Sequence, residues 1–197
     1  MSDQTSEKSL LRRSLLDARK QLSDEDLRAA AGSLADQALA LPELARAGTV
    51  AAYVSVGREP GTRALIDALR ARGVRVLLPV LLADNDLDWA AYEGPGHLVR
   101  AGRGLLEPDG PRLGPDAVTA ADTVLLPGLA VDARGMRLGR GGGSYDRVLA
   151  RISACGKAPA LVVLLYAHEV VARVPEEPHD HPVQAVVTPY GVTRFTA

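Results

Sequence analysis

The chain has 197 residues, 47% of them hydrophobic, and a formal net charge of −1 at pH 7, which suits one domain over residues 1–197 with a single sizeable core. The near-neutral charge argues against a nucleic-acid partner, because nucleic-acid-binding proteins have a marked basic excess. The one cysteine, Cys155, excludes an internal disulfide, and neither a signal peptide nor a membrane-spanning apolar run is found, so we expect a cytoplasmic protein with no membrane partner.

Two amphipathic helices are predicted at the start of the chain. In the first, over residues 6–22, apolar residues recur at helical intervals, at Leu11, Leu15, Ala18 and Leu22. Ser23 and Asp26 form a capping pattern for the second, whose apolar positions run from Leu27 to Leu41 until Pro42 ends the helix. We expect these helices to form an antiparallel pair.

After Gly48 the pattern changes to short runs rich in β-forming residues. Six strands are predicted, at 49–54, 74–80, 87–92, 123–126, 161–165 and 183–187, with helices at 62–72 and 145–153. Apolar runs such as Val162–Leu165 suit strands buried on both faces, as in parallel sheets covered by helices. We therefore predict a three-layer α/β/α fold with a mixed, mostly parallel central sheet and an N-terminal helical pair. Residues 93–121 are expected to form a long loop with little regular structure.

The most informative segment is the glycine-rich stretch Arg137–Asp146, which combines four glycines, two arginines and a carboxylate. Glycine has no Cβ, so successive backbone N–H groups can turn toward an anion and approach it closely. Arg137 and Arg140 add planar cationic groups, and the helix predicted to begin at Tyr145 would present its N-terminus to the same anion. Asp146 stands where a metal ion bound to a phosphate would need an oxygen ligand. The stretch predicts a phosphate-binding loop.

Two common nucleotide-binding motifs do not match this stretch. A P-loop requires a Gly-Lys-Ser/Thr ending, whereas the stretch contains no lysine. A dinucleotide fingerprint would follow its strand directly and would place glycine or alanine at position 144, which is Ser144. A flexible glycine-rich surface turn remains the alternative.

Polar residues follow three of the predicted strands at their carboxyl ends. These are the segment from Tyr53 to Glu59, the segment from Pro127 to the glycine-rich stretch, and Tyr166 with His168. Because ligands of open α/β sheets bind beyond the carboxyl ends of the strands, we expect these segments to converge on one cleft.

The segments 126–132, 135–143 and 144–146 closely resemble the signature of 5-formyltetrahydrofolate cyclo-ligases, also called methenyltetrahydrofolate synthetases. The resemblance spans nearly the whole chain in the right order. Further matching elements are Lys8–Arg12, Glu59 with Thr62, Gly104–Pro108, Glu177–Asp180 and Val186–Pro189. The resemblance implies an ATP- and Mg²⁺-dependent cyclisation of 5-formyltetrahydrofolate to 5,10-methenyltetrahydrofolate, by a monomer whose small-molecule partners are a reduced folate and ATP.

Site residues follow from this resemblance position by position. It implies that Arg140, Tyr145 and Asp146 are catalytic and that Asp146 and Asp180 are ligands of Mg²⁺. It also implies that the folate contacts Val54, Glu59, Arg140 and Ser144. The residues implied to bind ATP are Lys8, Arg12, Arg137, Leu138, Gly139, Arg140, Gly141, Gly142, Gly143, Ser144 and Tyr145. Without the resemblance, Lys8 and Arg12 would be interpreted as solvated helix charges, Asp180 as a turn residue and Tyr145 as core filling.

Three positions depart from the family pattern. Ser144 and Arg103 stand where an aromatic residue is usual, which removes apolar area that could stack on a pterin or adenine ring. Gln184 stands where an acidic residue is common, so we expect weaker order around the metal. These departures leave a second function open, that of a diverged relative that binds nucleotide or folate in a regulatory role or acts on a different N-acyl substrate.

Overall fold

The computed structural model describes residues 2–177 and 180–195, with side chains from residue 6 onward. Its centre is a seven-stranded sheet with the strand order β11-β10-β9-β6-β1-β2-β3. The strands are β1 (Thr49–Ala51), β2 (Arg75–Leu81), β3 (Leu87–Ala91), β6 (Thr123–Leu126), β9 (Ala160–Leu164), β10 (Ala185–Thr188) and β11 (Gly191–Arg194). The five inner strands are parallel, and the edge strands β3 and β11 are antiparallel to their neighbours. The predicted mixed, mostly parallel sheet is confirmed, and all six predicted strands form within a few residues of their expected bounds.

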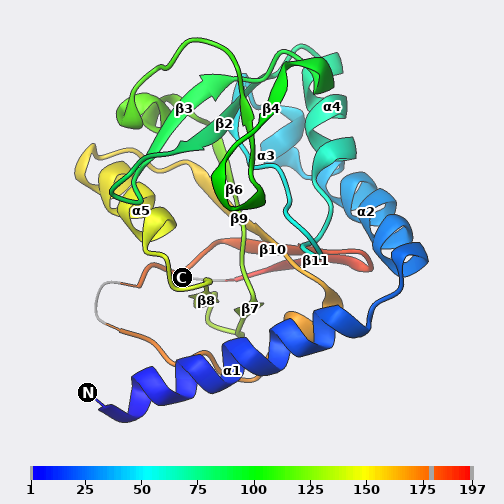
Figure 1. Ribbon diagram of the computed structural model, residues 1–197, viewed down its shortest axis with the longest axis vertical. Coiled ribbons are helices and arrows are strands. Elements are labelled where there is room, and N and C mark those ends of the chain that lie inside the picture. Colours follow the sequence, from blue (N-terminus) through cyan, green and yellow to red (C-terminus); the bar gives the residue numbers. More distant parts are fainter. Residues whose placement is uncertain (1, 178–179, 196–197) are drawn as a thin grey trace.

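Helices cover both faces of this sheet (Figure 1). On one face lie α2 (Asp24–Leu39), the short α3 (Pro42–Ala45) and α4 (Arg63–Ala71), whose apolar side chains share a core with inward-facing residues of the strands. On the other face lie α5 (Ser144–Ala154) and the 3₁₀ helix η3 (Pro115–Ala120), which bury a second core that includes Trp89. The three-layer α/β/α prediction is therefore confirmed.

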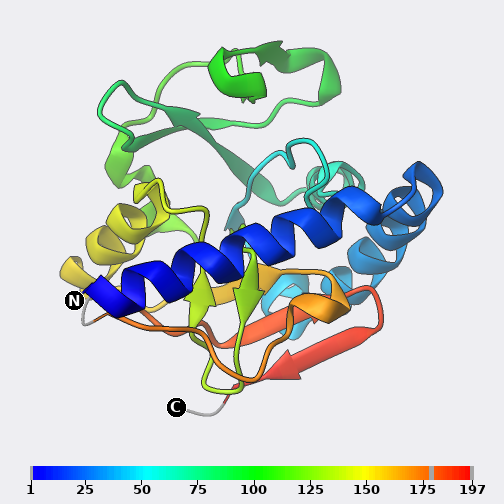
Figure 2. The ribbon, with the colours of Figure 1, turned by 60° about the horizontal axis from the view of Figure 1, so that its bottom comes forward.

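The N-terminal helix α1 (Ser2–Gln21) lies across one end of this sandwich rather than on a face (Figures 1 and 2). Its Leu15 packs on a small hairpin of β7 (Ala130–Val131) and β8 (Arg137–Leu138), together with Val174. Helix α2 begins with the predicted capping box of Ser23 and Asp26.

Both N-terminal helices form, but the expected antiparallel packing between them is wrong. The principal helix neighbour of α2 is α4, because its buried Leu34, Ala35 and Ala38 face the sheet and that helix. Pro42 does not simply stop a helix either, since it occupies the first turn of α3, where its missing N–H costs nothing.

Residues 93–121 are more regular than the long loop that we expected. They contain the 3₁₀ turns η1 (Pro95–His97) and η2 (Gly102–Gly104), the hairpin of β4 (Leu98–Arg100) and β5 (Leu106–Pro108), and η3. The hairpin projects at the top of Figure 2 and is tied to the sheet by Glu107, whose Oε1 accepts a hydrogen bond from the Leu81 N–H at 2.9 Å. Strands of three residues are too short for a periodicity signal, which explains the error. No helix in the described part of the chain has the length and apolarity needed to cross a membrane.

Candidate functional site

A cavity of about 320 Å³ opens at the carboxyl ends of β1, β2 and β6. Two of the three strand-end segments expected to converge do so, because Tyr53–Glu59 and Pro127–Gly128 both contribute to its wall. The third does not line it. The lining residues are Tyr53, Val54, Val56, Glu59, Pro79, Leu81, Asn85, Leu87, Arg103, Leu105, Leu106, Glu107, Pro127, Gly128, Arg137, Gly139–Gly143, Ser144, Tyr145 and Asp146. A mostly apolar wall with a few polar groups is typical of small-molecule sites.

The glycine-rich loop Gly139–Gly143 connects β8 to α5 on one side of this cavity. Its Gly141 and Gly143 have φ values of 91° and 75°, in the left-handed region that favours glycine. Gly143 is the N-cap of α5, and no side chain caps that helix, so the N–H groups of the first helical turn remain available to an anion. The Arg12 Nε donates a hydrogen bond to the Gly139 carbonyl at 2.9 Å and thereby supports the loop from α1.

Arg137 is a buried cation in the wall of the cavity, with a side chain only 6% exposed. Its Nη1 donates to the Pro127 carbonyl at 3.0 Å and its Nη2 to Asp146 Oδ1 at 3.2 Å, whereas its Nε has no partner within the described residues. Burial lowers the pKa of Arg137 and the Asp146 charge opposes this, but a guanidinium remains protonated in either case. The cavity therefore contains a fixed positive charge beside the glycine-rich loop.

Arg140 and Glu59 link two sides of the cavity. The Arg140 Nε lies 3.2 Å from Glu59 Oε1, while Glu59 Oε2 accepts a hydrogen bond from the Val56 N–H at 2.8 Å. Glu59 is thus oriented by its own loop, whereas the Arg140 side chain is about half exposed and free to turn toward a ligand.

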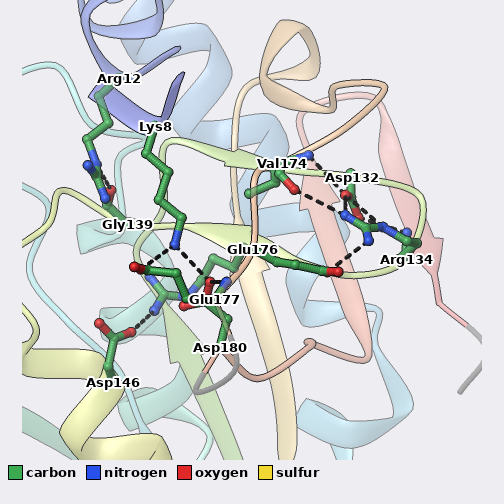
Figure 3. Close-up of polar contacts among 11 residues, drawn as sticks. Lys8, Arg12, Asp132, Arg134, Gly139, Asp146, Val174, Glu176, Glu177 and Asp180 are labelled. Atoms are coloured by element: carbon green, nitrogen blue, oxygen red, sulfur yellow. Dashed lines mark hydrogen bonds and ion pairs between the residues drawn. The ribbon is translucent and has the colours of Figure 1, made fainter. Parts of the chain in front are cut away.

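Lys8 and Asp180 are adjacent, although 172 positions separate them (Figure 3). The nearly buried Lys8 Nζ contacts Glu177 Oε2 at 2.8 Å and Asp180 Oδ2 at 2.9 Å. Burial would lower the pKa of Lys8, but the hydrogen bonds to these two carboxylates raise it. Lys8, Arg12 and Asp180 lie beside the cavity lining rather than in it. The neighbouring motif positions Pro178 and His179 fall outside the described residues.

The described residues contain no cluster of three or more His, Cys, Asp or Glu side chains that could hold a metal ion. Asp146 and Asp180 therefore do not make a metal site on their own. A hard cation at this position would need further oxygen ligands from a bound phosphate and from water.

Tyr145 and Tyr53 bring two phenol groups to the cavity wall. The Tyr145 hydroxyl is buried and has no hydrogen-bond partner in the part of the chain that the structure describes. Burial and the nearby Glu59 charge raise the pKa of Tyr145, and the Tyr53 pKa is raised for the same two reasons, so both phenols are neutral donors at pH 7. Tyr53 lies in a segment that we expected at the cleft, but the sequence did not identify it as a site residue, because an aromatic at a strand end is indistinguishable from core filling.

The remaining expected positions divide between the cavity and the core. Ser144 lines the cavity in the first turn of α5, and Arg103 lines it from the β4–β5 hairpin, where its Nη1 donates to Asn85 Oδ1 at 2.9 Å. The Leu138 side chain is instead buried with Leu129 in the core beneath α1.

The expectation for Gln184 is wrong. Its Oε1 accepts a hydrogen bond from the Leu161 N–H at 2.6 Å, at the amino ends of β9 and β10, which is the end of the sheet opposite the cavity. This residue supports strand pairing and has no part in ordering the site.

The fold and the site together define a three-layer α/β protein with a glycine-rich loop beside a largely apolar cavity. More specifically, the model of the 5-formyltetrahydrofolate cyclo-ligase family matches residues 4–189, and the chain belongs to this family of enzymes. The expected family and enzyme class are confirmed.

Named relatives agree with this assignment. The chain is 47% identical over 148 residues to the 5-formyltetrahydrofolate cyclo-ligase of Mycolicibacterium smegmatis, covering 72% of this chain and 73% of the relative. It is 33% identical over 178 residues to the 5-formyltetrahydrofolate cyclo-ligase of Escherichia coli strain K12, covering 88% of this chain and 96% of the relative. The solved structure of Aquifex aeolicus 5,10-methenyltetrahydrofolate synthetase superposes with a TM-score of 0.81 at 29% identity and covers 96% of this chain and 93% of that one.

Proposed function

We propose that this chain binds ATP and 5-formyltetrahydrofolate in the described cavity and cyclises the folate to 5,10-methenyltetrahydrofolate, releasing ADP and phosphate. The observation that supports this most directly is the continuity of the cavity wall. The glycine-rich loop, Arg137 and Asp146 line the same cavity as Tyr53 and Glu59. An anion held by the loop would therefore lie next to a ring held at Tyr53, which is the proximity that phosphoryl transfer between two substrates requires.

The chemistry of the substrate explains the need for ATP. The N-formyl group is amide-like, so its carbon is a poor electrophile and its oxygen does not leave unaided. The formyl oxygen attacks the γ-phosphorus of ATP, and the bond from that phosphorus to the bridging oxygen of ADP breaks. The N10 lone pair then bonds to the formyl carbon, N10 loses its proton, and the carbon–oxygen bond breaks. Phosphate leaves with the former formyl oxygen, and the positive charge is shared by the two nitrogens of the new ring.

Catalysis of the first step is mainly a matter of position and charge. The N–H groups of Gly139–Gly143 and the N-terminus of α5 would hold the phosphates. Arg137 would offset their charge from a fixed position, and Arg140 would turn from Glu59 toward the transferring group. Lys8 and Arg12 would act at the outer side of the triphosphate, next to the loop that Arg12 supports.

Mg²⁺ suits this site as part of a magnesium–ATP complex. This ion usually binds through one or two carboxylates together with phosphate oxygens and water. Asp146 in the first turn of α5 and Asp180 in the loop before β10 would supply those carboxylates. Each of these carboxylates pairs with a cationic side chain, Asp146 with Arg137 and Asp180 with Lys8. When bound, the ion would neutralise part of the triphosphate charge.

On the folate side, Glu59 would accept a hydrogen bond from the pterin, because the Val56 N–H already orients its carboxylate. Val54 and Tyr53 would pack against the ring system. The Tyr145 hydroxyl, which has no partner among the described residues, would donate to an acceptor on the substrate. Ser144 provides a smaller wall than an aromatic residue would.

The test is an absorbance assay of the purified chain with ATP, Mg²⁺ and 5-formyltetrahydrofolate. We expect the ultraviolet absorbance of the conjugated methenyl product to rise, with one phosphate released per product and no reaction when a non-hydrolysable ATP analogue replaces ATP. Binding of ATP without any rise in absorbance would contradict the proposal and favour a regulatory relative.

A further inference from the structure

Arg19 and Glu169 form a buried ion pair behind the cavity. Their side chains are 2% and 0% exposed, the Arg19 Nε donates to Glu169 Oε1 at 2.6 Å, and its Nη2 contacts Glu169 Oε2 at 3.0 Å. Neither residue lines the cavity. Taking two charges out of water is costly, and apolar residues of similar volume are often as stable, so stability alone does not account for this pair.

The pair differs from an apolar contact in its directional hydrogen bonds to loop backbone. The Arg19 Nη2 donates to the Gly128 carbonyl at 2.7 Å, and Gly128 lines the cavity. The preceding carbonyl, of Pro127, accepts from Arg137 at 3.0 Å. A Cβ at position 128 would lie 2.9 Å from Val163 Cγ2, so this backbone is already pressed against the sheet. Two buried guanidiniums, those of Arg19 in α1 and Arg137 in β8, thus hold the consecutive carbonyls of Gly128 and Pro127 in one part of the cavity wall.

Glu169 extends the same network to a second segment of the cavity wall, the loop after β1. It lies in the 3₁₀ turn η4 (Ala167–Glu169) after β9, and its Oε2 accepts a hydrogen bond from the Tyr166 N–H at 3.0 Å. The Tyr166 ring lies 5.7 Å from the Arg19 guanidinium, and its hydroxyl donates to the Arg58 carbonyl at 3.2 Å. Arg58 immediately precedes Glu59, the carboxylate of the folate side.

We propose that Arg19 and Glu169 are positioning residues that hold the Pro127–Gly128 and Arg58–Glu59 walls at the separation that the folate ring requires. The ion pair connects α1 to the loops after β1, β6 and β9, and the first two of these loops line the cavity. The inference rests on the proposed function for the identity of the ligand, but not for the existence of the network. The Arg19 Nη1 has no hydrogen-bond partner within the described residues. The guanidinium is therefore oriented toward Glu169 and the Gly128 carbonyl, although this orientation leaves one of its nitrogens unsatisfied.

The decisive variant replaces both charges at once, Arg19→Met with Glu169→Met. Because neither charge is left unpaired, we expect the double variant to fold, with a melting temperature lowered only by the loss of two backbone hydrogen bonds. The Gly128 carbonyl and the Tyr166 N–H lose their partners, so the KM for 5-formyltetrahydrofolate should rise about tenfold or more, since small misplacements of a site are costly. The KM for ATP should change by less than about twofold, because Arg137 and the glycine-rich loop are untouched. A folded double variant with an unchanged folate KM would overturn the proposal.

Arg134 and Asp132 provide the matched control. This pair also has a fully buried carboxylate, with the Arg134 Nη2 2.7 Å from Asp132 Oδ2, but it ties the β7–β8 hairpin to Val174 and does not line the cavity. Arg134→Met should lower the melting temperature and leave both KM values unchanged. Should Arg134→Met shift the folate KM as strongly as the double variant does, the effect belongs to stability in general and the positioning role is refuted.

Hydrogen exchange supplies a readout that does not depend on turnover. Backbone amides of residues 55–59 and 127–129 should exchange faster in the double variant than in the unchanged chain, and at the original rate in Arg134→Met. Equal rates at these segments in all three proteins would refute the network. If the chain without substitutions shows no cyclising activity, the proposed function is refuted but the positioning role is not. The hydrogen-exchange rates of the three proteins then still decide whether Arg19 and Glu169 hold these segments. Arg19→Lys, which keeps the charge but replaces the two guanidinium nitrogens that contact Glu169 and Gly128 by a single nitrogen, provides the same comparison if the double variant does not fold.

Discussion

Removing the Tyr145 hydroxyl should raise the stability of the folded chain and lower its activity. In the ligand-free chain this hydroxyl is buried and has no partner among the described residues, so Tyr145→Phe removes a group that folding has desolvated without compensation. A buried polar group in this state costs roughly 1–3 kcal/mol. We expect the free energy of unfolding to rise by about 1 kcal/mol, which corresponds to a melting temperature roughly 2–4 °C higher for a chain of this size.

Activity should move in the opposite direction. If the hydroxyl donates to the substrate during the reaction, its loss removes one neutral hydrogen bond, worth about 1.4 kcal/mol or roughly tenfold in kcat/KM. The measurements are thermal unfolding and the absorbance assay on the same preparation. A less stable Tyr145→Phe variant with unchanged kcat/KM would refute this reasoning, because it would place the hydroxyl in a structural hydrogen bond.

Tyr92→Phe is the control for the same chemical change. Its hydroxyl donates to Asp67 Oδ1 at 2.5 Å, and the residue does not line the cavity. Loss of a hydrogen bond to a charged acceptor should lower the free energy of unfolding by about 1.5–3 kcal/mol. The kinetic constants of Tyr92→Phe should stay unchanged. We therefore expect Tyr145→Phe to raise the free energy of unfolding and lower kcat/KM, and Tyr92→Phe to lower the free energy of unfolding without changing kcat/KM.

Three further substitutions test the phosphate side, the folate side and the fold. Asp146→Asn keeps an oxygen acceptor for the buried Arg137 but loses the charge, so kcat should fall at least about a hundredfold while the melting temperature changes little. Asp146→Ala would instead mix an effect on stability with the effect on catalysis, because it leaves Arg137 without a side-chain acceptor. Equal losses of stability and turnover in Asp146→Asn would contradict this role. Ser144→Tyr adds a ring at the cavity wall and should lower the folate KM by about three- to tenfold; an unchanged value would mean that the wall does not contact the ring system. The hydrogen bonds from Arg151 lower the pKa of Asp86, so its stabilisation is present at neutral pH and is lost as the pH falls through the folded-state pKa. Asp86→Asn should therefore cost about 1–2 kcal/mol in denaturant unfolding at pH ~7, and this cost should shrink as the pH falls below the usual range of an aspartate pKa. A pH-independent difference would exclude the ion pair as its source.

The local sequence was sufficient to predict the regular elements and the glycine-rich loop. Runs such as Val162–Leu165 are apolar on every residue, which suits strands buried on both faces, and Ser23 with Asp26 indicates a helix start within four residues. Gly141 and Gly143 are needed because their backbones adopt positive φ values. These features depend on neighbouring residues only, so the family signature could be read from the chain before its fold was known.

Tertiary structure decided which side chains face one another. Lys8 and Arg19 belong to the same helix and look alike as helix charges, yet Lys8 contacts Asp180 whereas Arg19 is buried against Glu169 behind the cavity. Tyr53 reaches the ligand cavity, and Gln184 lies at the opposite end of the sheet. Periodicity states which face of an element is buried but not what covers it. A cavity built from segments up to about a hundred residues apart in the chain therefore follows from strand order and packing, which no local pattern encodes.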